Sequence, residues 1–588
     1  MDISHSHNSG SPHQHILHRL HALQQQFRHI SPQAMQRTAA EFNIPLSQVA
    51  AVVAFYSFFS TQPRGRFDIL FSNCTSCGYL SGDQDLMRML CQLLQVTPGR
   101  TRADGLISIG ETSCIGMCDQ GASLLINGLP VTALNAEKLT QIAQRITTES
   151  PFTDWPAEWF TVHDRIYRRD LLLMEQHAPG SALQTALAQG ADQTLAVIQQ
   201  SGLRGRGGAG FDTGKKWQLC RAAPCNAHYV VCNADEGEPG TFKDRLLLRD
   251  HADAMIEGMT VCALVIGAKQ GFIYLRGEYR YLLPHLHAVL DQRRDQGLLG
   301  QHILGYGNFE FDIDIVVGAG AYICGEESAL IESLEGKPGI PRIRPPFPVT
   351  HGYLGQPTIV NNVETFIAAA HIIAHGSAWF NSIGTKQSRG TKILSISGDC
   401  EKPGIYEYPF GVSIDEVLND CGAWNVQAVQ IGGPAGKLLG AAEFNRAISF
   451  EDVSTGGSFL VFDQQRDLLA VHRNFAHFFA HESCGFCTPC RVGTQLLKNN
   501  LDKIAEGRGT THDIEELKQL SHLIQHQSHC GLGHTAAHHV LDGLQHFPHI
   551  FSAPLQPHFT ARFDLDQALE SARQATHRND AAAHLDNE

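Results

Sequence analysis

Hydrophobic residues recur at steps of three and four near the beginning of the chain, which is the period of a helix with one buried face. The first such stripe runs from Ile16 to Phe27. A second helix is expected after Ser31, because serine is a common helix cap and Pro32 suits the first helical position. A third is expected at about residues 47–58. This pattern predicts a helical segment at residues 16–65.

Strand patterns replace the helical period from Phe67 onward. Two short apolar runs, FDILF and LISIG, flank a helical stretch, and Asn127-Gly128 between two further runs predicts a hairpin turn. We expect a compact α/β domain at 66–150. The segment 151–175, which contains prolines and several aromatic residues, is expected to be an extended linker.

Apolar strands alternate with helical stretches over residues 176–385, which predicts a sheet covered by helices. Residues 386–470 form a smaller unit that is rich in strands and glycine. Helical spacing returns at 471–550, most clearly at 492–504, 514–524 and 535–544. The polar ends, 1–15 and 551–588, are expected to be a disordered tail and a frayed C-terminal tail. The fold class is therefore α/β multidomain.

Composition and charge narrow the classes of function. The 588 residues are 43% hydrophobic and 18% charged, a balance typical of globular proteins. The formal net charge of −14 argues against nucleic acid as a partner, because phosphate binding needs a basic surface. No apolar run is long enough for a transmembrane helix, and the beginning of the chain does not resemble a secretory signal. We expect a cytoplasmic protein, away from the membrane, whose thiols stay reduced.

The chain has 16 cysteines, and their spacing separates candidate ligands from packing residues. Three thiols at steps of three and one remote thiol suit a 4Fe-4S cluster. Zinc sites normally use two pairs, so zinc and simple packing are the weaker alternatives. The candidate cluster ligands are Cys484, Cys487, Cys490 and Cys530. Six isolated cysteines are interpreted as packing residues: Cys91, Cys220, Cys225, Cys262, Cys400 and Cys421.

A second set of cysteines consists of two close pairs in the first α/β domain. Cys74 and Cys77 form one pair, and Cys114 and Cys118 the other. Two pairs that flank α/β structure suit either zinc or a 2Fe-2S cluster, and the spacing does not decide between them.

Three glycine-rich segments follow or precede predicted helices and strands. GLRGRGGAGFDTGKKW has the G-x-G-x-x-G spacing, with basic residues that would favour an anion, but such turns are common. CNADEGEPGTFKDR and GAGAYICGEE follow strands and carry acids. Acids at strand ends often bind ribose or ring groups. A plain surface turn, a magnesium site and a solvated acidic face are the alternatives.

Six longer motifs, in order, resemble the NADH-binding flavoprotein subunit of respiratory complex I and its soluble relatives. They are GLRGRGGAGF, CNADEGEPGTFKDR, GAGAYICGEES, PRIRPPFP, TIVNNVET and HESCGFCTPCRVGT, and the likeness spans about residues 195–550. Residues 16–145 resemble a second peripheral subunit of complex I through FNIPLSQVAAVVAFYSFF, RGR and CIGMC. The fusion of both is similar to the diaphorase large subunit of cytosolic NAD-reducing nickel–iron hydrogenases.

The resemblance implies an architecture for the predicted segments. It implies an N-terminal helical hairpin with a thioredoxin-like 2Fe-2S ferredoxin domain, and a Rossmann-like domain for FMN and NAD. A small β-grasp-like domain and a C-terminal helical bundle with the 4Fe-4S cluster would follow. The expected cofactors are thus FMN, NAD and both clusters.

The resemblance also implies individual binding residues. Those expected at the flavin are Gly205, Arg206, Gly207, Lys216, Asn233, Asp235, Glu236, Tyr322, Gly325, Glu326, Asn361 and Asn362. Those expected at NAD(H) are Gly208, Phe211, Glu238, Glu327, Arg344 and Phe347. Glu327 would meet the adenosine ribose, and an acid there favours NAD over NADP because a 2′-phosphate would face like charge.

This chain departs from the family pattern at several positions. Asp212 and Lys215 stand where proline and leucine are usual, and Leu219 stands in place of an aromatic residue. The first cysteine pair is closer than usual, which puts Ser72 at the usual ligand position. The resemblance therefore leaves open whether Cys74 is a cluster ligand.

The implied activity is NAD(H):acceptor oxidoreduction, without a catalytic side chain beyond the cofactor. Hydride transfer moves two electrons and clusters accept one, so FMN is the required converter. A nickel–iron site needs cysteine pairs that this chain does not offer. The expected partners are therefore a ferredoxin-like small diaphorase subunit and a nickel–iron hydrogenase heterodimer. Alternatives are a complex I module, an NAD-dependent formate dehydrogenase subunit, and a zinc-stabilised nucleotide-binding scaffold.

Overall fold

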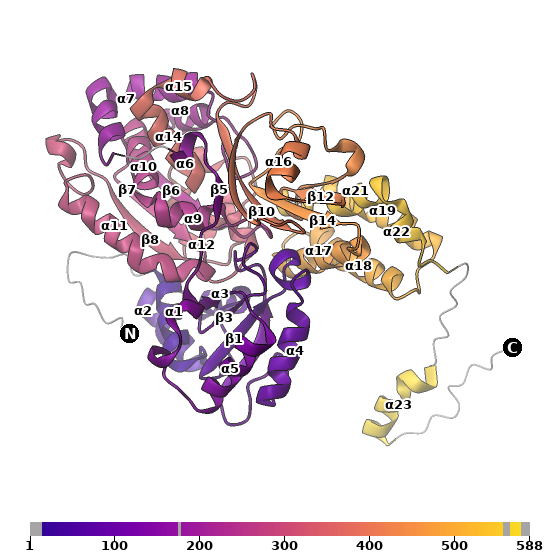
Figure 1. Cartoon of the computed structure of the whole chain (residues 1–588). Coiled ribbons are helices and arrows are strands. Elements are labelled where there is room, and N and C mark those ends of the chain that lie inside the picture. Colours follow the sequence, from indigo (N-terminus) through magenta and orange to yellow (C-terminus); the bar gives the residue numbers. More distant parts are fainter. Residues whose placement is uncertain (1–14, 175–177, 557–564, 578–588) are drawn as a thin grey trace.

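The structure, a computed structural model, describes residues 15–174, 178–556 and 565–577. In Figure 1 the N-terminal helices and a first sheet lie at the bottom, and a parallel sheet with its helices lies at the upper left. A mixed sheet lies at the upper right, beside the C-terminal helices. Residues 1–14 of the predicted disordered tail lie outside the described residues, whereas His15 caps the first helix.

Three helices form the N-terminal segment: α1 (Ile16–Phe27), α2 (Pro32–Phe42) and α3 (Leu46–Phe55). Ser31 accepts a hydrogen bond from the amide of Ala34, which confirms the predicted cap. The apolar stripe of α1 is buried in a cluster that includes side chains of the parallel sheet. This segment is therefore packed on the parallel sheet formed by later residues.

The first sheet has the order β2-β1-β3-β4. Asn127 and Gly128 both have positive φ at the β3–β4 turn, which confirms the predicted hairpin. Because β1 and β2 are parallel, their carboxyl ends lie at the same edge, and each is followed by one cysteine pair. The elements are β1 (Phe67–Ser72), η1 (Thr75–Tyr79), α4 (Asp83–Leu94), β2 (Ile107–Thr112), β3 (Leu124–Ile126), β4 (Leu129–Val131) and α5 (Ala136–Thr147).

The segment predicted as an extended linker contributes to another sheet. It contains η2 (Phe152–Asp154), η3 (Ala157–Phe160), β5 (Ile166–Arg168) and α6 (Leu171–Met174). β5 pairs in parallel with β11 (Gly404–Pro409) and forms the edge of a six-stranded mixed sheet with the order β13-β12-β14-β10-β11-β5. The other elements here are β10 (Thr391–Gly398), α16 (Ile414–Cys421), β12 (Val426–Ile431), β13 (Lys437–Gly440), η8 (Ala441–Glu443) and β14 (Ser458–Asp463).

A four-stranded sheet with the order β8-β7-β6-β9 is parallel throughout. Its strands are β6 (Tyr229–Ala234), β7 (Gln270–Leu275), β8 (Asp312–Val317) and β9 (Thr358–Asn362). Its helices are α7 (Ser181–Ser201), α8 (Thr213–Ala222), α9 (Lys243–Asp250), α10 (Ala252–Ile266), η4 (Gly277–Leu282), α11 (Leu283–Asp295), η5 (Ile303–Gly305), η6 (Tyr322–Gly325), α12 (Glu327–Leu334), α13 (Pro348–His351), η7 (Tyr353–Gly355), α14 (Val363–His375) and α15 (Ser377–Asn381). All carboxyl ends lie at one edge, where α/β proteins bind ligands.

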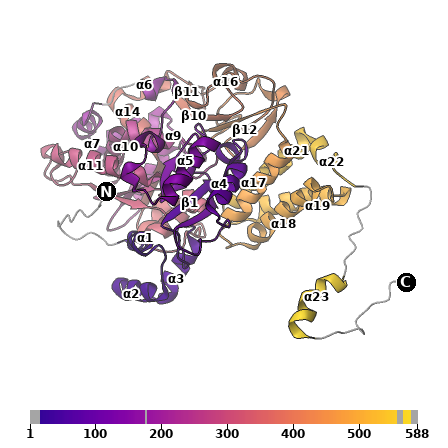
Figure 2. The ribbon, with the colours of Figure 1, turned by 60° about the horizontal axis from the view of Figure 1, so that its bottom comes forward.

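The C-terminal part is helical, as predicted. Its helices are α17 (Leu468–Glu482), α18 (Thr488–Ala505), α19 (Thr511–Gln527), α20 (Gly531–Thr535), α21 (His538–His546), α22 (Pro548–Ser552) and α23 (Leu565–Thr576). α23 stands apart from the other helices in both ribbon views (Figures 1 and 2). Residues 557–564 and 578–588 of the predicted C-terminal tail lie outside the described residues. Within the described ranges, no helix combines the length and the apolarity needed to cross a bilayer.

Candidate redox-cofactor site

The two cysteine pairs of the first sheet form one group of four thiols. All four sulfur atoms, those of Cys74, Cys77, Cys114 and Cys118, lie within 4.8 Å of one another and are buried. The Sγ of Cys74 lies 3.0 Å from that of Cys77 and 3.8 Å from that of Cys118. Four converging buried thiols fit a metal centre better than packing residues, since thiolates are the usual cluster ligands.

Ser72 lies beside this group, at the end of β1. Its Oγ is 2.9 Å from the Sγ of Cys77. Cys74 follows in the loop, and its side chain accepts a hydrogen bond from the amide of Cys77. The short spacing therefore brings the Cys74 sulfur into the four-thiol group while Ser72 stays in contact with it.

The second cysteine set lies at the junction of α17, α18 and α20. Cys484, Cys487, Cys490 and Cys530 line one cavity together with Ile323, Phe486, His529 and Leu532. Cys487 caps α18, and Cys490 lies in that helix's first turn, so the helix start sets their spacing. Thiols around a common, largely apolar cavity fit a cluster, whereas packing residues would fill the space.

The G-x-G-x-x-G segment forms a hairpin, which we call the glycine hairpin (residues 204–212). Arg204 and Asp212 pair as a bridge, and the amide of Gly205 donates to the carbonyl oxygen of Phe211 over 2.9 Å. A β-carbon on Gly207 would lie 3.3 Å from that of Asn362, so a larger residue would press on the end of β9. The hairpin therefore lies over the carboxyl edge of the parallel sheet.

Asp212, one of the departures from the family pattern, caps α8. Its carboxylate accepts a hydrogen bond of 2.7 Å from the amide of Lys215. Aspartate is a favoured N-cap because its oxygen satisfies an unpaired helix amide. Asp212, which stands where the family usually has proline, thus stabilises the start of α8.

Arg206 differs from the other predicted flavin residues. Its buried guanidinium lies 4.7 Å from the ring centre of Phe410 and donates to the carbonyl oxygen of Arg389. Its amide donates to Thr365 over 3.0 Å. The side chain is thus held between the parallel and mixed sheets, and only the backbone of Arg206 lies in the hairpin.

The acids that follow β6 are buried, and Glu236 and Glu238 accept hydrogen bonds from neighbouring segments. Glu236 accepts from the amide of Asp244 at the start of α9, over 2.8 Å. Glu238 accepts from the hydroxyl of Tyr322 and from the amide of Ala435. Burial raises the pKa of Asp235 to about 8 and the pKa values of Glu236 and Glu238 to about 7. Near neutral pH these acids are therefore able to carry protons.

Oxygen Oδ2 of Asp235 is buried without a hydrogen-bond partner among the described residues. Buried polar atoms are nearly always paired, so this oxygen fits a polar group of a bound cofactor. Asn233 beside it donates to the carbonyl oxygen of Gly325 over 2.8 Å, which joins the ends of β6 and β8. These residues therefore fit a polar ring or polyol such as that of FMN.

The residues predicted for the adenosine end lie near α12. Lys216 donates to Glu327 over 2.8 Å, and Arg344 lies 3.0 Å from Glu326. Phe211 and Phe347 expose 50% and 51% of their surface, so both rings are accessible for stacking on a ligand. The structure thus brings most of the residues predicted for the flavin together at the ends of β6, β8 and β9, with the side chain of Arg206 as the exception. The rings of Phe211 and Phe347 lie at the surface, without a described contact to this group.

Two buried lysines at this site were missed by the sequence interpretation. Lys243 pairs with Asp244 at 2.6 Å and with Glu364 at 3.0 Å. Lys392 of β10 pairs with Glu364 at 2.5 Å and donates to the carbonyl oxygen of Arg206 over 3.1 Å. Lys243 stands inside a motif that the sequence analysis quoted, but Lys392 is a single lysine in an apolar strand and has no sequence signal.

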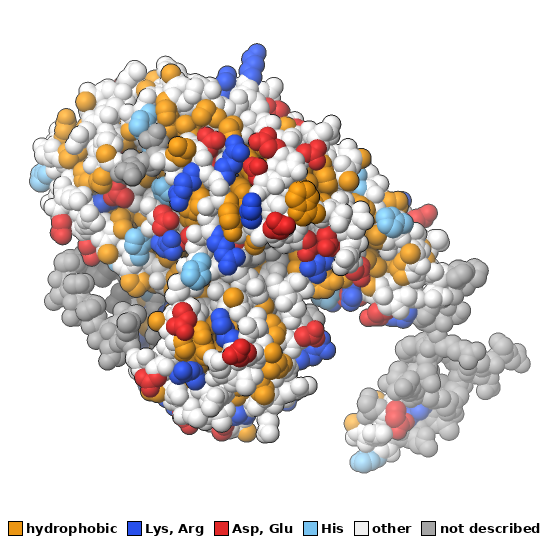
Figure 3. Space-filling model, in the orientation of Figure 1, with side chains coloured by type: hydrophobic (Ala, Val, Ile, Leu, Met, Phe, Trp, Pro, Cys, Tyr) orange, Lys and Arg blue, Asp and Glu red, His pale blue; other side chains and the backbone are white. Residues whose placement is uncertain are grey.

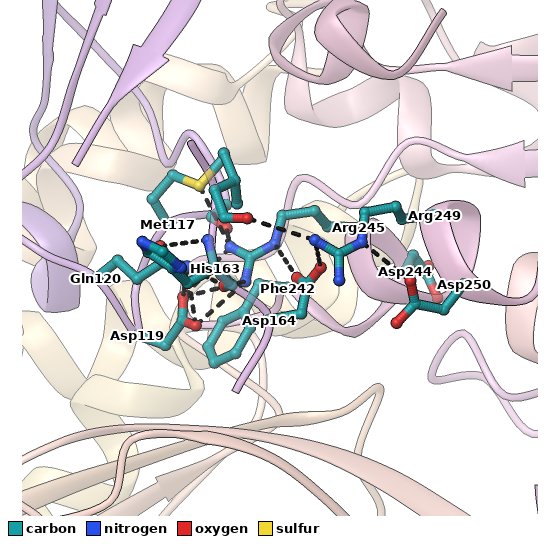
Figure 4. Close-up of polar contacts among 12 residues, drawn as sticks. Met117, Asp119, Gln120, His163, Asp164, Phe242, Asp244, Arg245, Arg249 and Asp250 are labelled. Atoms are coloured by element: carbon teal, nitrogen blue, oxygen red, sulfur yellow. Dashed lines mark hydrogen bonds and ion pairs between the residues drawn. The ribbon is translucent and has the colours of Figure 1, made fainter. Parts of the chain in front are cut away.

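Buried side chains also join the first cysteine group to the acids that follow β6. Arg245 donates to the carbonyl oxygen of Gly116 over 2.6 Å and pairs with Asp119 at 3.2 Å (Figure 4). Arg276 donates to the carbonyl oxygens of Cys114 and Glu236. These contacts hold the first sheet against the parallel sheet.

Glu482, at the end of α17, connects the second cysteine group to the other two candidate sites. Its carboxylate accepts from the hydroxyl of Ser113 and from the amide of Tyr322. One side chain thus touches the cysteine loop after β2 and the loop after β8, two residues before Cys484. All three candidate cofactor sites therefore meet around a shared polar junction.

Three family profiles match successive parts of the chain. Residues 2–147 match the thioredoxin-like [2Fe-2S] ferredoxin, and residues 198–371 match the Nuo51 FMN-binding domain. Residues 470–554 match the iron–sulfur binding region of NADH-ubiquinone oxidoreductase F. The matched regions contain the first cysteine group, the glycine hairpin and the second cysteine group, in that order.

Known proteins and solved structures resemble this chain over most of its length. The alpha subunit of the NAD-reducing hydrogenase HoxS of Cupriavidus necator is 40% identical over 93% of each chain. Subunit HndC of the NADP-reducing hydrogenase of Solidesulfovibrio fructosivorans is 41% identical over 61% of this chain and 76% of its own. A chain in the crystal structure of an H2-reduced NAD+-reducing [NiFe]-hydrogenase superposes with a TM-score of 0.90 at 42% identity, over 97% of this chain and 98% of that one.

Proposed function

The chain belongs to the family of alpha subunits of NAD-reducing hydrogenases, and from this premise we propose that it is the diaphorase subunit of such an enzyme. Its activity is NAD(H):acceptor oxidoreduction, with electrons passed through iron–sulfur centres to partner subunits. The observation that carries the proposal is the match over 93% of both chains, which includes all three cofactor regions.

When bound, FMN supplies the conversion between the two-electron hydride of NAD(H) and one-electron carriers. The protein holds it against the carboxyl edge of the parallel sheet. Gly205 and Gly207 let the hairpin backbone approach closely, and Asn361 and Asn362 meet the phosphate side. Asn233, Asp235 and Glu236 receive the ring and the ribityl chain, together with Lys216, Tyr322, Gly325 and Glu326 and the backbone of Arg206.

NAD(H) is proposed to stack between the hairpin and the loop that follows α12. Phe211 and Phe347 offer half-exposed rings for the adenine, and Glu238 lies toward the nicotinamide. Glu327, which contacts Lys216 in this structure, would accept a hydrogen bond from the adenosine ribose. Gly208 and Arg344 complete this set.

Cys484, Cys487, Cys490 and Cys530 are proposed to hold the 4Fe-4S cluster, and Cys74, Cys77, Cys114 and Cys118 the 2Fe-2S cluster. Glu482 positions the loops of both sites relative to Tyr322. The protein's part in electron transfer is thus to keep these centres at fixed separations.

The partners, the cellular location and the domain classes are also proposed from membership of this family. The partners are a ferredoxin-like small diaphorase subunit and a nickel–iron hydrogenase heterodimer, and the place of action is the cytoplasm, where cluster thiolates stay reduced. The Rossmann-like class of the parallel-sheet domain and the β-grasp-like class of the mixed-sheet domain are supported by the sheet orders. The domain boundaries are kept as expected, except that β5, from the segment 151–175, joins the mixed sheet.

The test is an anaerobic purification of the chain with its partners. We expect flavin bands, a broad iron–sulfur absorption, extractable FMN and NADH-specific reduction of an artificial acceptor. Cys484→Ser should lose the 4Fe-4S signal, whereas Cys91→Ser, a buried cysteine of α4, should keep it. A colourless, zinc-containing protein that stays inert after reconstitution with FMN and iron would refute the proposal.

A further inference from the structure

A cavity of about 580 Å³ lies beside the glycine hairpin. Its walls come from the hairpin, the end of α7, and the turn between α15 and β10 that carries Lys386, Gln387 and Arg389. None of the residues assigned to FMN lines it, and of those assigned to NAD(H) only Phe211 does. The cavity is therefore separate from the flavin site and adjoins the adenine end of the dinucleotide site.

Three cationic side chains line this cavity: Arg204, Lys386 and Arg389. In the part of the chain that the structure describes, none of the three has an acid within ion-pair distance. The one acid in the lining is Asp212, whose carboxylate caps α8 through the amide of Lys215, so cations outnumber acids in the lining by three to one. In a chain of net charge −14, three cations without acidic partners around one cavity favour an anionic ligand.

The orientation of Arg204 is set by the protein. Its Nε donates to the carbonyl oxygen of Gly210 over 2.6 Å, and its guanidinium lies 4.1 Å from the ring centre of Phe450. A guanidinium that is already oriented loses little freedom when it binds an anion, and arginine suits phosphate because it presents parallel donors. The amide side chain of Gln387 adds a neutral donor to the lining.

The shape and the apolar part of the cavity narrow the ligand class. Its volume lies within the range of about 300–1,000 Å³ that is typical of small-molecule sites, and is more than a lone phosphate fills. Phe211 exposes half of its surface at the edge, and aromatic rings bind nucleobases by stacking. A charged end and an aromatic end in one cavity fit a nucleotide.

Basic side chains elsewhere do not form a comparable surface on the face seen in Figure 3. There, Lys and Arg side chains are interspersed with Asp and Glu rather than gathered in one extended patch. This face therefore gives no support to a diffuse attraction to polyanions.

We propose that this cavity is a second nucleotide site, which binds the phosphates of a purine mononucleotide through Arg204, Lys386 and Arg389 and its base against Phe211. Since Phe211 also serves the proposed NAD(H) site, a nucleotide bound here competes with the adenine of NAD(H). This competition rests on the proposed function, whereas the binding itself does not.

The test is calorimetric binding to the intact complex at constant ionic strength, with ADP, adenosine and inorganic phosphate as probes. We expect ADP to bind more tightly than phosphate, and adenosine to bind least. The double variant Lys386→Ala/Arg389→Ala should weaken ADP binding at least about tenfold, since two charge-assisted contacts are lost. The matched variant Lys386→Arg/Arg389→Lys keeps both charges and should bind ADP within about twofold of the parent.

Three other outcomes would overturn the proposal. ADP binding that is unchanged in the double alanine variant but lost in Phe347→Ala would place ADP in the dinucleotide site. Adenosine that binds as tightly as ADP would exclude a phosphate role, and phosphate that binds as tightly as ADP would exclude a nucleotide. A complex that binds ADP as expected but does not oxidise NADH would refute the proposed function and leave this site standing.

Discussion

The ammonium group of Lys392 lies 3.1 Å from the carbonyl oxygen of Arg206, so a strand of the mixed sheet directly supports the glycine hairpin. The same lysine pairs with buried Glu364. The hairpin's position thus depends on a residue that lies 186 positions further along the chain. The small mixed-sheet domain therefore supports the hairpin that is proposed to hold the flavin.

Replacing this lysine should loosen the flavin site. Lys392→Met removes the support of the hairpin and leaves Glu364 with Lys243 as its remaining cation. We expect FMN to bind about tenfold more weakly, the order seen when supporting residues of a site are removed. Titration of the deflavinated complex with FMN, followed by flavin fluorescence, measures this. Lys437→Met, which replaces an exposed lysine at the start of β13, is the control, and equal losses in both variants would contradict a specific role of Lys392.

The choice of the fourth 2Fe-2S ligand can be tested at two neighbouring positions. Cys74→Ser should abolish or strongly alter the 2Fe-2S signal in electron paramagnetic resonance, because its sulfur lies in the four-thiol group. Ser72→Ala should keep the signal, because its oxygen only contacts Cys77. Loss of the signal in Ser72→Ala with retention in Cys74→Ser would show that the serine is the ligand.

The contact between the first and parallel sheets should depend on Arg245. It pairs with Asp119 at 3.2 Å and with Asp164 at 3.4 Å, and all three side chains are buried (Figure 4). Arg245→Met leaves two buried carboxylates without this partner, which costs about 3–5 kcal/mol. We expect faster amide hydrogen exchange in residues 114–120 and faster proteolysis at 151–165.

Arg249 provides the matched control for this contact. It also pairs with Asp164, but its side chain is 43% exposed, so solvent screens much of the interaction. Arg249→Met should therefore leave the exchange of residues 114–120 close to that of the parent. An equal effect of both substitutions would show that burial of the Arg245 pair does not determine the domain contact.

Docking of α1 should weaken in acid. Burial lowers the pKa of His15 to about 4 and that of His21 to about 3, while each ring contacts a backbone carbonyl, of Leu334 and Gly318. His18 and Arg280 add positive charge nearby. The undocked helix takes up protons below about pH 6.5 and the docked one does not. Stability is thus complete above pH 6.5 and falls as the pH drops toward 4.

Hydrogen exchange of the α1 amides between pH 7.5 and 5.5, corrected for intrinsic rates, measures this loss. Each histidine contributes about 1.4 kcal/mol per pH unit below 6.5, or about tenfold in the opening equilibrium. The double variant His15→Gln/His21→Gln keeps side-chain donors without a titrating ring and should flatten the dependence. A dependence that persists in this variant would assign it to other groups.

Local signals in the sequence predicted several structural details. Ser31 and Asn127-Gly128 were predicted correctly because a cap and a tight turn depend on adjacent residues. The four-thiol group at Cys74 follows from two loops that end parallel strands. The direction of the Arg206 side chain was not predictable, because it depends on rings from two other segments. Resemblance, rather than periodicity, indicated the binding residues.

Strand β5 determines the order in which the three sheets can fold while the chain is being synthesised. Ile166 pairs with Ile405, roughly 240 residues later, and the ribosome adds about 5–20 residues per second. Residues 166–168 therefore wait on the order of 10–50 s for their neighbour, while the first sheet and the parallel sheet, whose strands precede residue 363, are already complete. The mixed sheet is then the last to close, and its closure ties the first half of the nascent chain to the second.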